Sequence, residues 1–412
     1  MKKLALAIFF LQISLGITYA ADFYVSEITA FVSPDSSYSA LVDFIDNAKA
    51  SLYVNVYTFD SPLIAERIIN AKTKGVDVII MVDKSPVAGI SGEEKVVISY
   101  LLSNGVPVYY SDDKKVRYNH AKYVIADNVS ILITTENFGY SGFSADSSSG
   151  ARGWGAVIHD APLTRYFLDI FFEDLQYVEK ASPLPATAAY KNPKKKYSSK
   201  FGAKNFKGNF FVTPVVAPEN AVEKIVVLLN SANKSIYIEQ FYIYRHWGSI
   251  KKDTPETAPN LFLEAAINAA RRGAEVKILL DSTWYNIEAE DPVSNYNTLK
   301  YVQGVAKKES LNLQVKLADS KKLGLEKIHT KGVVVDKKVV LISSINWNEH
   351  SPTKNREIGV IIHGEPAQYF AEVFECDWSG TCYNKKFIYL VAIGILLLAI
   401  YAKRKYNNIY TH

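Results

Sequence analysis

Cysteine and methionine are scarce in this chain, with two of each among its 412 residues. Two cysteines are too few for a four-thiolate zinc site or for a small domain held together by several disulfides. Cys376 and Cys382 lie close together, so an oxidising compartment would let them close a small loop, and free thiols are the alternative. The chain is long enough to form two ordinary domains with sizeable cores.

Two common motifs for phosphate and metal binding are absent. The sequence has no Gly-x4-Gly-Lys-Ser/Thr loop to cradle a nucleotide phosphate and no His-Glu-x-x-His pattern to bind zinc. Four of the seven histidines lack ligand-like spacing and are expected to have core or surface roles: His159, His246, His350 and His363. The sequence therefore predicts neither a metal site nor another cofactor.

An excess of one charge is missing from most of the chain. The formal net charge is +5, and all of it comes from terminal residues: Lys2, Lys3, Lys403, Arg404 and Lys405. Residues 21–402 are left with 42 basic and 42 acidic side chains. This balance argues against a general polyanion-binding protein, although a local basic patch stays open as an alternative.

The longest apolar runs lie near the two ends of the chain. Residues 1–20 join a basic start to an apolar run and a small-residue cleavage site, which predicts a signal peptide; an uncleaved anchor is the alternative. Residues 387–402 are uncharged and mostly apolar between basic clusters, which predicts a transmembrane helix; a buried core helix is the alternative. Residues 403–412 would then be a short cytoplasmic tail, and the body of this single-pass membrane protein is expected outside the cytosol.

The rest of the chain contains an internal repeat. A helical stretch, a β-rich run, a second helical stretch and a second β-rich run follow one another twice: 40–50, 51–57, 63–74 and 76–82, then 221–232, 235–241, 261–272 and 274–280. Strands that alternate with helices indicate a mixed or parallel sheet covered by helices. The two halves are expected to span 25–180 and 211–380.

Residues 181–210, between these halves, differ from them in composition. Seven lysines and several prolines occur there without any acidic residue, and five aromatic residues are interleaved with them. A solvated basic linker is the favoured interpretation. The alternative is a basic, aromatic strip at the mouth of a cleft that binds phosphate-rich ligands.

One short pattern occurs at matching places in both halves. Each copy has a histidine, a lysine two residues on, an aspartate five further and an asparagine ten beyond that: His120, Lys122, Asp127 and Asn137, then His329, Lys331, Asp336 and Asn346. Residues two apart on a strand face the same side, so each histidine and lysine are expected to point into one cleft. The asparagines follow the next apolar run, and a neighbouring strand would deliver them to the same place.

If the halves pack symmetrically, their clefts merge and two imidazoles lie on either side of one phosphorus atom. One imidazole can then attack the phosphorus while the other protonates the leaving alkoxide. The lysines and asparagines would stabilise charge on the nonbridging oxygens. Both aspartates are expected to stabilise the motif strands instead of taking part in the chemistry.

This duplicated pattern resembles the phospholipase D superfamily, whose signature is His-x-Lys-x4-Asp-x6-Gly-Ser-x-Asn in two copies. The resemblance covers nearly all of 25–375 and implies a covalent phosphohistidine intermediate, no metal, and transfer to water or an alcohol. The chain departs from the signature at the Gly-Ser pair, which is Thr134-Thr135 in one copy and Ser343-Ser344 in the other. Thr135 and Ser344 keep the hydroxyl and are expected to support the site.

Superfamily members tend to place a carboxylate some 25 to 32 residues after the histidine, where it holds the imidazole of the opposite half. Glu357 stands 28 residues after His329, whereas the first half has Gly153 at the corresponding place. A carboxylate bonded to an imidazole fixes its tautomer and stabilises the imidazolium. We therefore predict that Glu357 orients His120, that His120 is the nucleophile and that His329 is the general acid.

Together these features predict an α/β protein of two similar sandwich halves, each a mixed β-sheet flanked by helices. The halves form one pseudo-two-fold active-site cleft, and a C-terminal transmembrane helix follows them. The resemblance implies a phosphodiesterase, and the balanced charge and the expected membrane anchor favour phospholipid as its substrate, by hydrolysis or headgroup transfer. A nuclease acting on DNA or RNA is the alternative, and an inactive binding or structural member is the second. The expected partners are the phosphodiester substrate and the membrane; no protein partner is required, since both motifs are in one chain.

Overall fold

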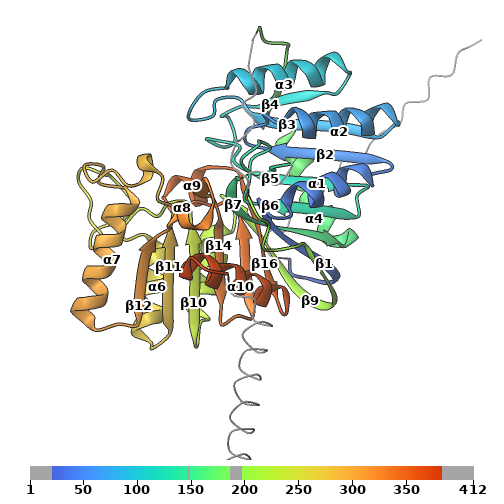
Figure 1. Ribbon diagram of the computed structural model, residues 1–412. Coiled ribbons are helices and arrows are strands. Elements are labelled where there is room, and N and C mark those ends of the chain that lie inside the picture. Colours follow the sequence, from blue (N-terminus) through green and yellow to red (C-terminus); the bar gives the residue numbers. More distant parts are fainter. Residues whose placement is uncertain (1–20, 146–148, 186–196, 383–412) are drawn as a thin grey trace, which may run out of the picture.

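The structure, a computed structural model, describes residues 21–145, 149–185 and 197–382 (Figure 1). The predicted signal peptide, the predicted span at 387–402 and the predicted tail at 403–412 lie outside these ranges, as does 186–196 in the predicted linker. Within the described ranges, Cys376 and Cys382 form a disulfide. This finding decides between the loop and the free thiols.

No helix in the described part of the chain is long and apolar enough to cross a membrane. This finding corrects two predictions. The C-terminal transmembrane helix is removed from the expected fold class, and the expected single-pass localisation is not supported. The predicted span was short on physical grounds as well. Its sixteen residues would cover about 24 Å at 1.5 Å per residue, less than a typical hydrocarbon core of roughly 30 Å.

Each half contributes a matching series of strands. The first half holds β1 (Phe23–Ser33), β2 (Ser51–Val56), β3 (Asp77–Asp83), β4 (Val108–Ser111), β5 (Lys122–Ala126), β6 (Ser130–Thr134), β7 (Ala151–His159) and β8 (Val178–Lys180). The second half holds β9 (Lys204–Ala217), β10 (Ser235–Gln240), β11 (Glu275–Leu280), β12 (Leu313–Leu317), β13 (Lys327–Ile328), β14 (Lys331–Val335), β15 (Val339–Ser343) and β16 (Glu357–His363). Strand β9 begins inside the window expected to be a linker.

These strands form one continuous sheet, where the sequence predicted a separate sheet in each half. The order is β12-β11-β10-β14-β15-β16-β9-β1-β7-β6-β5-β2-β3-β4-β8, and β13 pairs with β7 off this path. At the centre, β1 and β9 run antiparallel, with Phe23 opposite Val212 and Ala30 opposite Lys204. Read outward from this pair, the two halves have the same strand order as far as β4 and β12, and β8 continues the first half beyond β4. The pairing removes two sheet edges that would otherwise be exposed.

Helices cover both faces of the sheet (Figure 1). The long helices of the first half are α1 (Ser37–Asp46), α2 (Pro62–Thr73), α3 (Gly92–Ser103) and α4 (Ala161–Asp174). Those of the second half are α5 (Ala221–Asn230), α6 (Leu261–Arg271), α7 (Asn295–Glu309) and α10 (Pro366–Ser379); α8 (Ser320–Leu323), α9 (His350–Lys354) and the 3-10 turn η1 (Trp284–Asn286) are short.

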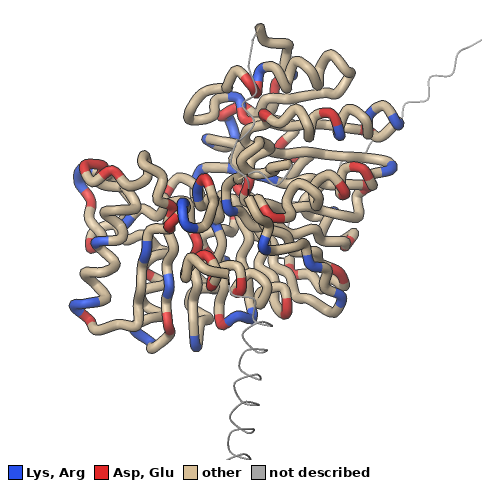
Figure 2. The backbone as a smooth tube through the Cα atoms, viewed as in Figure 1, with Lys and Arg blue, Asp and Glu red and all other residues tan. Residues whose placement is uncertain are grey.

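The apolar side chains form three buried clusters. One lies under α1, α2 and α3, a second under α5 and α6, and the third joins both halves through α4 and α10. The shared cluster and the continuous sheet make the two halves one packed body. Basic and acidic residues are interspersed along the backbone of both halves (Figure 2), in line with the balanced charge of the sequence.

Local signals explain where the repeated helices begin and end. The hydroxyl of Ser61 accepts a hydrogen bond from the N–H of Ile64, and Pro62 is the first helical residue of α2. In α6, the side chain of Asn260 caps the helix in the same way. Each helix is followed by a glycine with positive φ, Gly75 at 91° and Gly273 at 100°. Both turns lead directly into the next parallel strand.

Candidate active site

A cavity of about 820 Å³ lies between the two halves, and both motif histidines line it. His120 comes just before β5 and His329 just before β14, so each imidazole stands at the end of a motif strand. The backbone N–H of His120 donates to the carbonyl of Arg356 at 2.9 Å, and that of His329 donates to the carbonyl of Arg152 at 2.8 Å. These two hydrogen bonds cross between the halves and bring the histidines to one cavity.

The imidazole of His120 is held by a carboxylate and an aromatic ring. Its Nδ1 lies 2.7 Å from Oε2 of Glu357, which the sequence placed against this histidine. The ring of Tyr57 meets it edge-on, with 4.6 Å between centroids. Oε1 of the buried Glu357 accepts hydrogen bonds from Ser351 Oγ at 2.5 Å and Asn355 Nδ2 at 3.2 Å. Because Nδ1 faces the carboxylate, Nε2 is the ring nitrogen that can meet a ligand.

The imidazole of His329 has a carboxylate partner that the sequence analysis missed. Its Nδ1 lies 3.1 Å from Oε2 of Glu136, which is buried in the loop after β6. A carboxylate immediately before the motif residue Asn137 was the signal in the sequence. The predicted division of labour assumed that only His120 had such a partner, and this assumption is wrong. The roles of the two histidines stay a prediction.

The motif lysines are fully buried beneath the histidines and are not among the residues that line the cavity. Lys122 Nζ donates to the carbonyl of His120, and Lys331 Nζ donates to that of His329, each at 2.6 Å. The ammonium of Lys122 lies 5.2 Å from the ring centre of Tyr57, and a matching contact of 5.3 Å joins Lys331 to Phe241. Both ammonium groups are therefore held in place next to the histidines.

The motif asparagines line the cavity with the histidines. Asn137 follows β6 and Asn346 follows β15, the neighbours of the motif strands in the sheet. Their carboxamide oxygens are buried and have no hydrogen-bond partner among the described residues. Buried polar atoms are nearly always satisfied, so both carboxamides are available to a bound molecule.

The motif aspartates lie at the opposite end of β5 and β14 from the histidines. Asp127 and Asp336 have φ of 55° and 53°, and each carboxylate accepts three backbone N–H groups from the segment before β2 or β10: Lys49, Ala50 and Ser51, or Asn233, Lys234 and Ser235. Burial raises the pKa of both carboxyl groups, but these hydrogen bonds outweigh it and the pKa is lowered. This geometry ties the motif hairpin to the sheet.

Two hydroxyls stand where the superfamily signature has serine. Thr135 Oγ1 accepts the N–H of Trp154 at 3.1 Å, and Ser344 Oγ accepts the N–H of Ile358 at 3.0 Å. Neither hydroxyl lines the cavity. They fasten the loops that carry the asparagines to β7 and β16.

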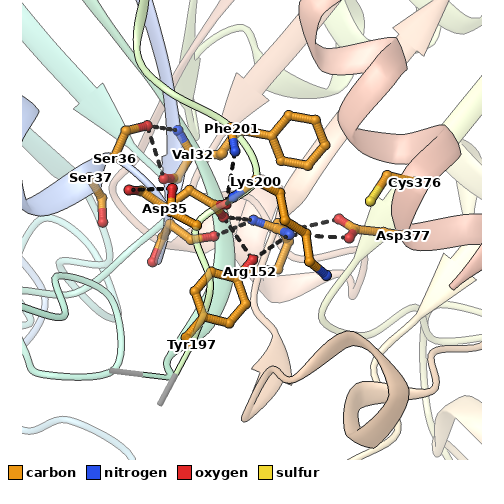
Figure 3. Close-up of polar contacts among 12 residues, drawn as sticks. Val32, Asp35, Ser36, Ser37, Arg152, Tyr197, Lys200, Phe201, Cys376 and Asp377 are labelled. Atoms are coloured by element: carbon orange, nitrogen blue, oxygen red, sulfur yellow. Dashed lines mark hydrogen bonds and ion pairs between the residues drawn. The ribbon is translucent and has the colours of Figure 1, made fainter. Parts of the chain in front are cut away.

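Two buried arginines connect the halves behind the histidines. Arg152 of β7 lies 2.7 Å from Asp377 of α10 and 2.5 Å from Asp35, and Figure 3 shows it between these two carboxylates. Its counterpart on β16, Arg356, lies 2.8 Å from Asp174 of α4 and 2.6 Å from Glu219. The carbonyl oxygens of the same two arginines accept the N–H groups of the histidines. These ion pairs therefore help to place the imidazoles.

Burial lowers the pKa of the cationic groups in the site. It brings the pKa of His120 to about 4 and that of Lys122 to about 7, since desolvation outweighs the attraction of Glu357. The pKa values of His329 and Lys331 fall well below their usual range for the same reason, with repulsion from nearby lysines added. A negatively charged group placed here would relieve this repulsion, so the site is suited to an anion.

The two carboxylates differ in their electrostatics. Burial raises the pKa of Glu136. Burial acts in the same direction on Glu357, but its interactions with His120 and Lys122 outweigh it and lower the pKa. No group of three or more His, Cys, Asp or Glu that could hold a metal ion occurs among the described residues.

Aromatic and basic side chains surround the histidines on the cavity wall. They include Tyr118, Tyr242, Tyr244, Tyr285, Arg117 and Lys327. By contrast, no described residue of 181–210 lines the cavity. From this window, Tyr197 is buried with its hydroxyl 3.3 Å from Arg152 Nη2 (Figure 3). Tyr197 therefore packs against a buried arginine and not at the mouth of the cavity.

Comparison with known proteins gives partial matches to two curated relatives. Cardiolipin synthase A of Wigglesworthia glossinidia brevipalpis is 26% identical over 175 residues, which are 39% of this chain and 31% of the relative. The 5'-3' exonuclease PLD3 of Xenopus tropicalis is 26% identical over 158 residues, which are 37% of this chain and 28% of the relative. Each match thus spans less than a third of the relative's own length.

Comparison of whole folds gives a broader match. Phosphatidylserine synthase of Haemophilus influenzae Rd KW20 has a TM-score of 0.61, and the match covers 87% of both chains at 16% identity. A likeness at this identity concerns the fold alone. The family model described as "Cardiolipin synthase, PLD-like domain" matches residues 41–175 and 225–378. These two ranges make up most of the chain, and one range lies in each half. The chain belongs to this family of phospholipase D-like proteins.

Proposed function

We propose that the protein is a phosphodiesterase that works through a covalent phosphohistidine. One observation carries the proposal: two imidazoles, each held at Nδ1 by a buried carboxylate, line the same cavity. An imidazole fixed in this way keeps its proton on Nδ1 and presents Nε2 to the ligand. Two such groups supply a nucleophile and a proton donor on either side of one phosphorus atom.

In the first step, Nε2 of His120 attacks phosphorus and forms a P–N bond. The P–O bond to the leaving alkoxide breaks. The negative charge of the bound phosphodiester favours the imidazolium form of His329, which is protonated at both ring nitrogens, and this imidazolium gives the leaving oxygen its Nε2 proton. In the second step, His329 takes a proton from water or an alcohol, whose oxygen attacks phosphorus and breaks the P–N bond. Lys122 and Lys331 offset the negative charge of the phosphoryl group, whose presence in turn raises the pKa of both lysines.

A phospholipid is the substrate we propose first. The matching family description and one curated relative are both named for cardiolipin synthase. The balanced charge of 21–402 also suits a substrate with one or a few phosphates. Apolar side chains are exposed at the cavity, where Val87 is 81% and Tyr285 42% exposed, and Trp284 next to Tyr285 is 72% exposed. Such side chains can contact acyl chains near a cleaved headgroup.

A nucleic-acid substrate is the second candidate, because the wall of the cavity combines aromatic rings with fixed cations. Tyr118, Tyr242 and Tyr244 can stack on bases, and Arg117 and Lys327 can pair with phosphates. The other curated relative is named as an exonuclease. Single strands fit this combination better than duplexes, since their bases are free to stack.

The deciding experiment offers the full-length chain three substrates: phosphatidylcholine vesicles, single-stranded DNA and bis-p-nitrophenyl phosphate. We expect the wild type, but not His120→Asn, to release headgroup from the vesicles and p-nitrophenol from the small diester. Cleavage of DNA without cleavage of lipid would replace the first substrate by the second. A folded protein inactive on all three would overturn the phosphodiesterase and favour an inactive binding member of the family.

A further inference from the structure

The two histidines receive their carboxylates from different positions of the repeat. In the second half, Glu357 lies on β16, and Ile345 stands immediately before the motif residue Asn346. In the first half, the counterpart of Ile345 is Glu136, and the counterpart of Glu357 is Gly153. The carboxylate thus lies on the loop after β6 in the first half and on strand β16 in the second, and in both cases it contacts the imidazole of the opposite half.

Glu136 occupies the space that a side chain at position 153 would fill. A Cβ added to Gly153 would lie 2.2 Å from Oε1 and 2.5 Å from Cγ of Glu136. Atoms do not approach so closely, and Gly153 is buried in the middle of the sheet, so a larger residue there would displace Glu136. In the second half, Ile345 is fully buried in the apolar cluster under α5 and α6, and Glu357 keeps its own place on β16.

We propose that Glu136 is the positioning residue for His329 and that glycine is required at 153 to admit it. The proposal rests on the proposed function, in which His329 donates and accepts a proton at Nε2. Oε2 of Glu136 lies 3.1 Å from Nδ1 and keeps a proton there, while Thr135 Oγ1 donates to Oε1 at 3.2 Å and fixes the carboxylate. In each half, one of the two positions supplies the carboxylate that holds the histidine, Glu136 for His329 and Glu357 for His120. The other position, Gly153 or Ile345, carries no charge.

The test moves the carboxylate from position 136 to position 153 on β7. The double variant Glu136→Ile/Gly153→Glu gives the first half the arrangement found in the second. Glu136→Ile alone removes the carboxylate, and Gly153→Glu alone forces two carboxyl groups into one space. Glu239→Gln is the matched control, because Glu239 is equally buried and bonds Thr330 Oγ1 at 2.8 Å without a bond to either imidazole.

Two readouts separate positioning from a structural role. Nitrogen-15 NMR of the histidines reports the tautomer of His329 without turnover. We expect the Nδ1–H form in the wild type, its loss in Glu136→Ile and its return in the double variant. In turnover, Glu136→Ile is expected to lower kcat by about 10²- to 10⁴-fold, and the double variant to recover to within about tenfold of the wild type. Glu239→Gln should change neither.

An unchanged His329 tautomer in folded Glu136→Ile would overturn the proposal. So would a folded double variant in which neither the tautomer nor the rate recovers. The proposed function fails separately: if the wild type cleaves no phosphodiester while the tautomer still follows the carboxylate, the enzyme assignment is lost and the positioning role stands.

Discussion

The carboxyl groups that hold the two histidines differ in the direction of their pKa shifts. Glu357 accepts hydrogen bonds from Ser351 and Asn355 and has a lowered pKa, whereas burial raises the pKa of Glu136. A phosphohistidine carries positive charge on its ring, and the carboxyl group that loses its proton more readily stabilises this charge better. This difference in pKa supports His120 as the nucleophile. It replaces the earlier reason, which was that His329 had no carboxylate partner.

The first prediction traps the intermediate. His329→Ala is expected to accumulate a labelled phosphoenzyme from bis-p-nitrophenyl phosphate, because p-nitrophenolate leaves without a proton from the enzyme. The attack of water then lacks its base and slows by about 10²- to 10⁴-fold. Peptide mapping of the quenched protein should place the label on His120. His120→Ala/His329→Ala is the unlabelled control, and a wild-type label on His329 would reverse the two roles.

A second prediction follows from the low pKa values in the site. Lys122, with a pKa of about 7, is mostly neutral at pH 8. Binding of sulfate, which does not titrate in this range, raises that pKa, and the lysine takes up a proton. Calorimetry in two buffers of different ionisation enthalpy should therefore show proton uptake at pH 8. Lys122→Met should reduce the uptake. Proton release by the wild type on binding sulfate would contradict the lowered pKa of Lys122.

At the scale of helices and strands, local sequence signals predicted many of the elements. The cap at Ser61 with Pro62, and the matching cap at Asn260, mark α2 and α6 within a residue of where the sequence placed them. The pairing of β1 with β9 was not foreseen, because a strand pattern does not name its partner. Glu136 was missed for a similar reason: its bond to His329 spans 193 residues.

The third prediction concerns the hairpins that carry the motifs. Asp127→Ala removes the acceptor of three backbone N–H groups and should lower the free energy of unfolding by about 2 kcal/mol, and Asp336→Ala should do the same. Since the pKa of both carboxyl groups is lowered, this stabilisation is present above the unfolded pKa and is lost as pH falls through the folded one. Urea unfolding at pH 7 and pH 3 measures both effects. An unchanged kcat of the folded variants would separate these aspartates from the chemistry.

At the scale of the molecule, the active site exists because two similar halves share one sheet and one core. The strand order repeats outward from β1 and β9, and the cluster under α4 and α10 belongs to both halves. Each half supplies the carboxylate and the arginine carbonyl that hold the histidine of the other. Neither half alone contains a complete set, so the site depends on how the halves are joined.

The last prediction tests this dependence at Arg356. Its guanidinium is fully buried between Asp174 and Glu219, while its carbonyl holds the N–H of His120. Arg356→Met removes the cation from Glu219 and leaves Asp174 with Lys115 alone, and breaking a buried pair typically costs about 3–5 kcal/mol. The imidazole of His120 should also lose its exact placement, so kcat of the remaining folded protein should fall.

Arg271→Met is the matched comparison, since Arg271 pairs with Glu264 and Glu309 at the surface and should cost at most about 1 kcal/mol. Urea unfolding and turnover are measured for both variants. Replacing Glu219 by Leu in the Arg356→Met background should recover part of the stability, because this carboxylate has then lost its ion-pair partner. It should not recover kcat if the arginine places His120. Equal losses at Arg356 and Arg271 would mean that the buried ion pairs do not join the halves, and that the shared core alone holds the two histidines together.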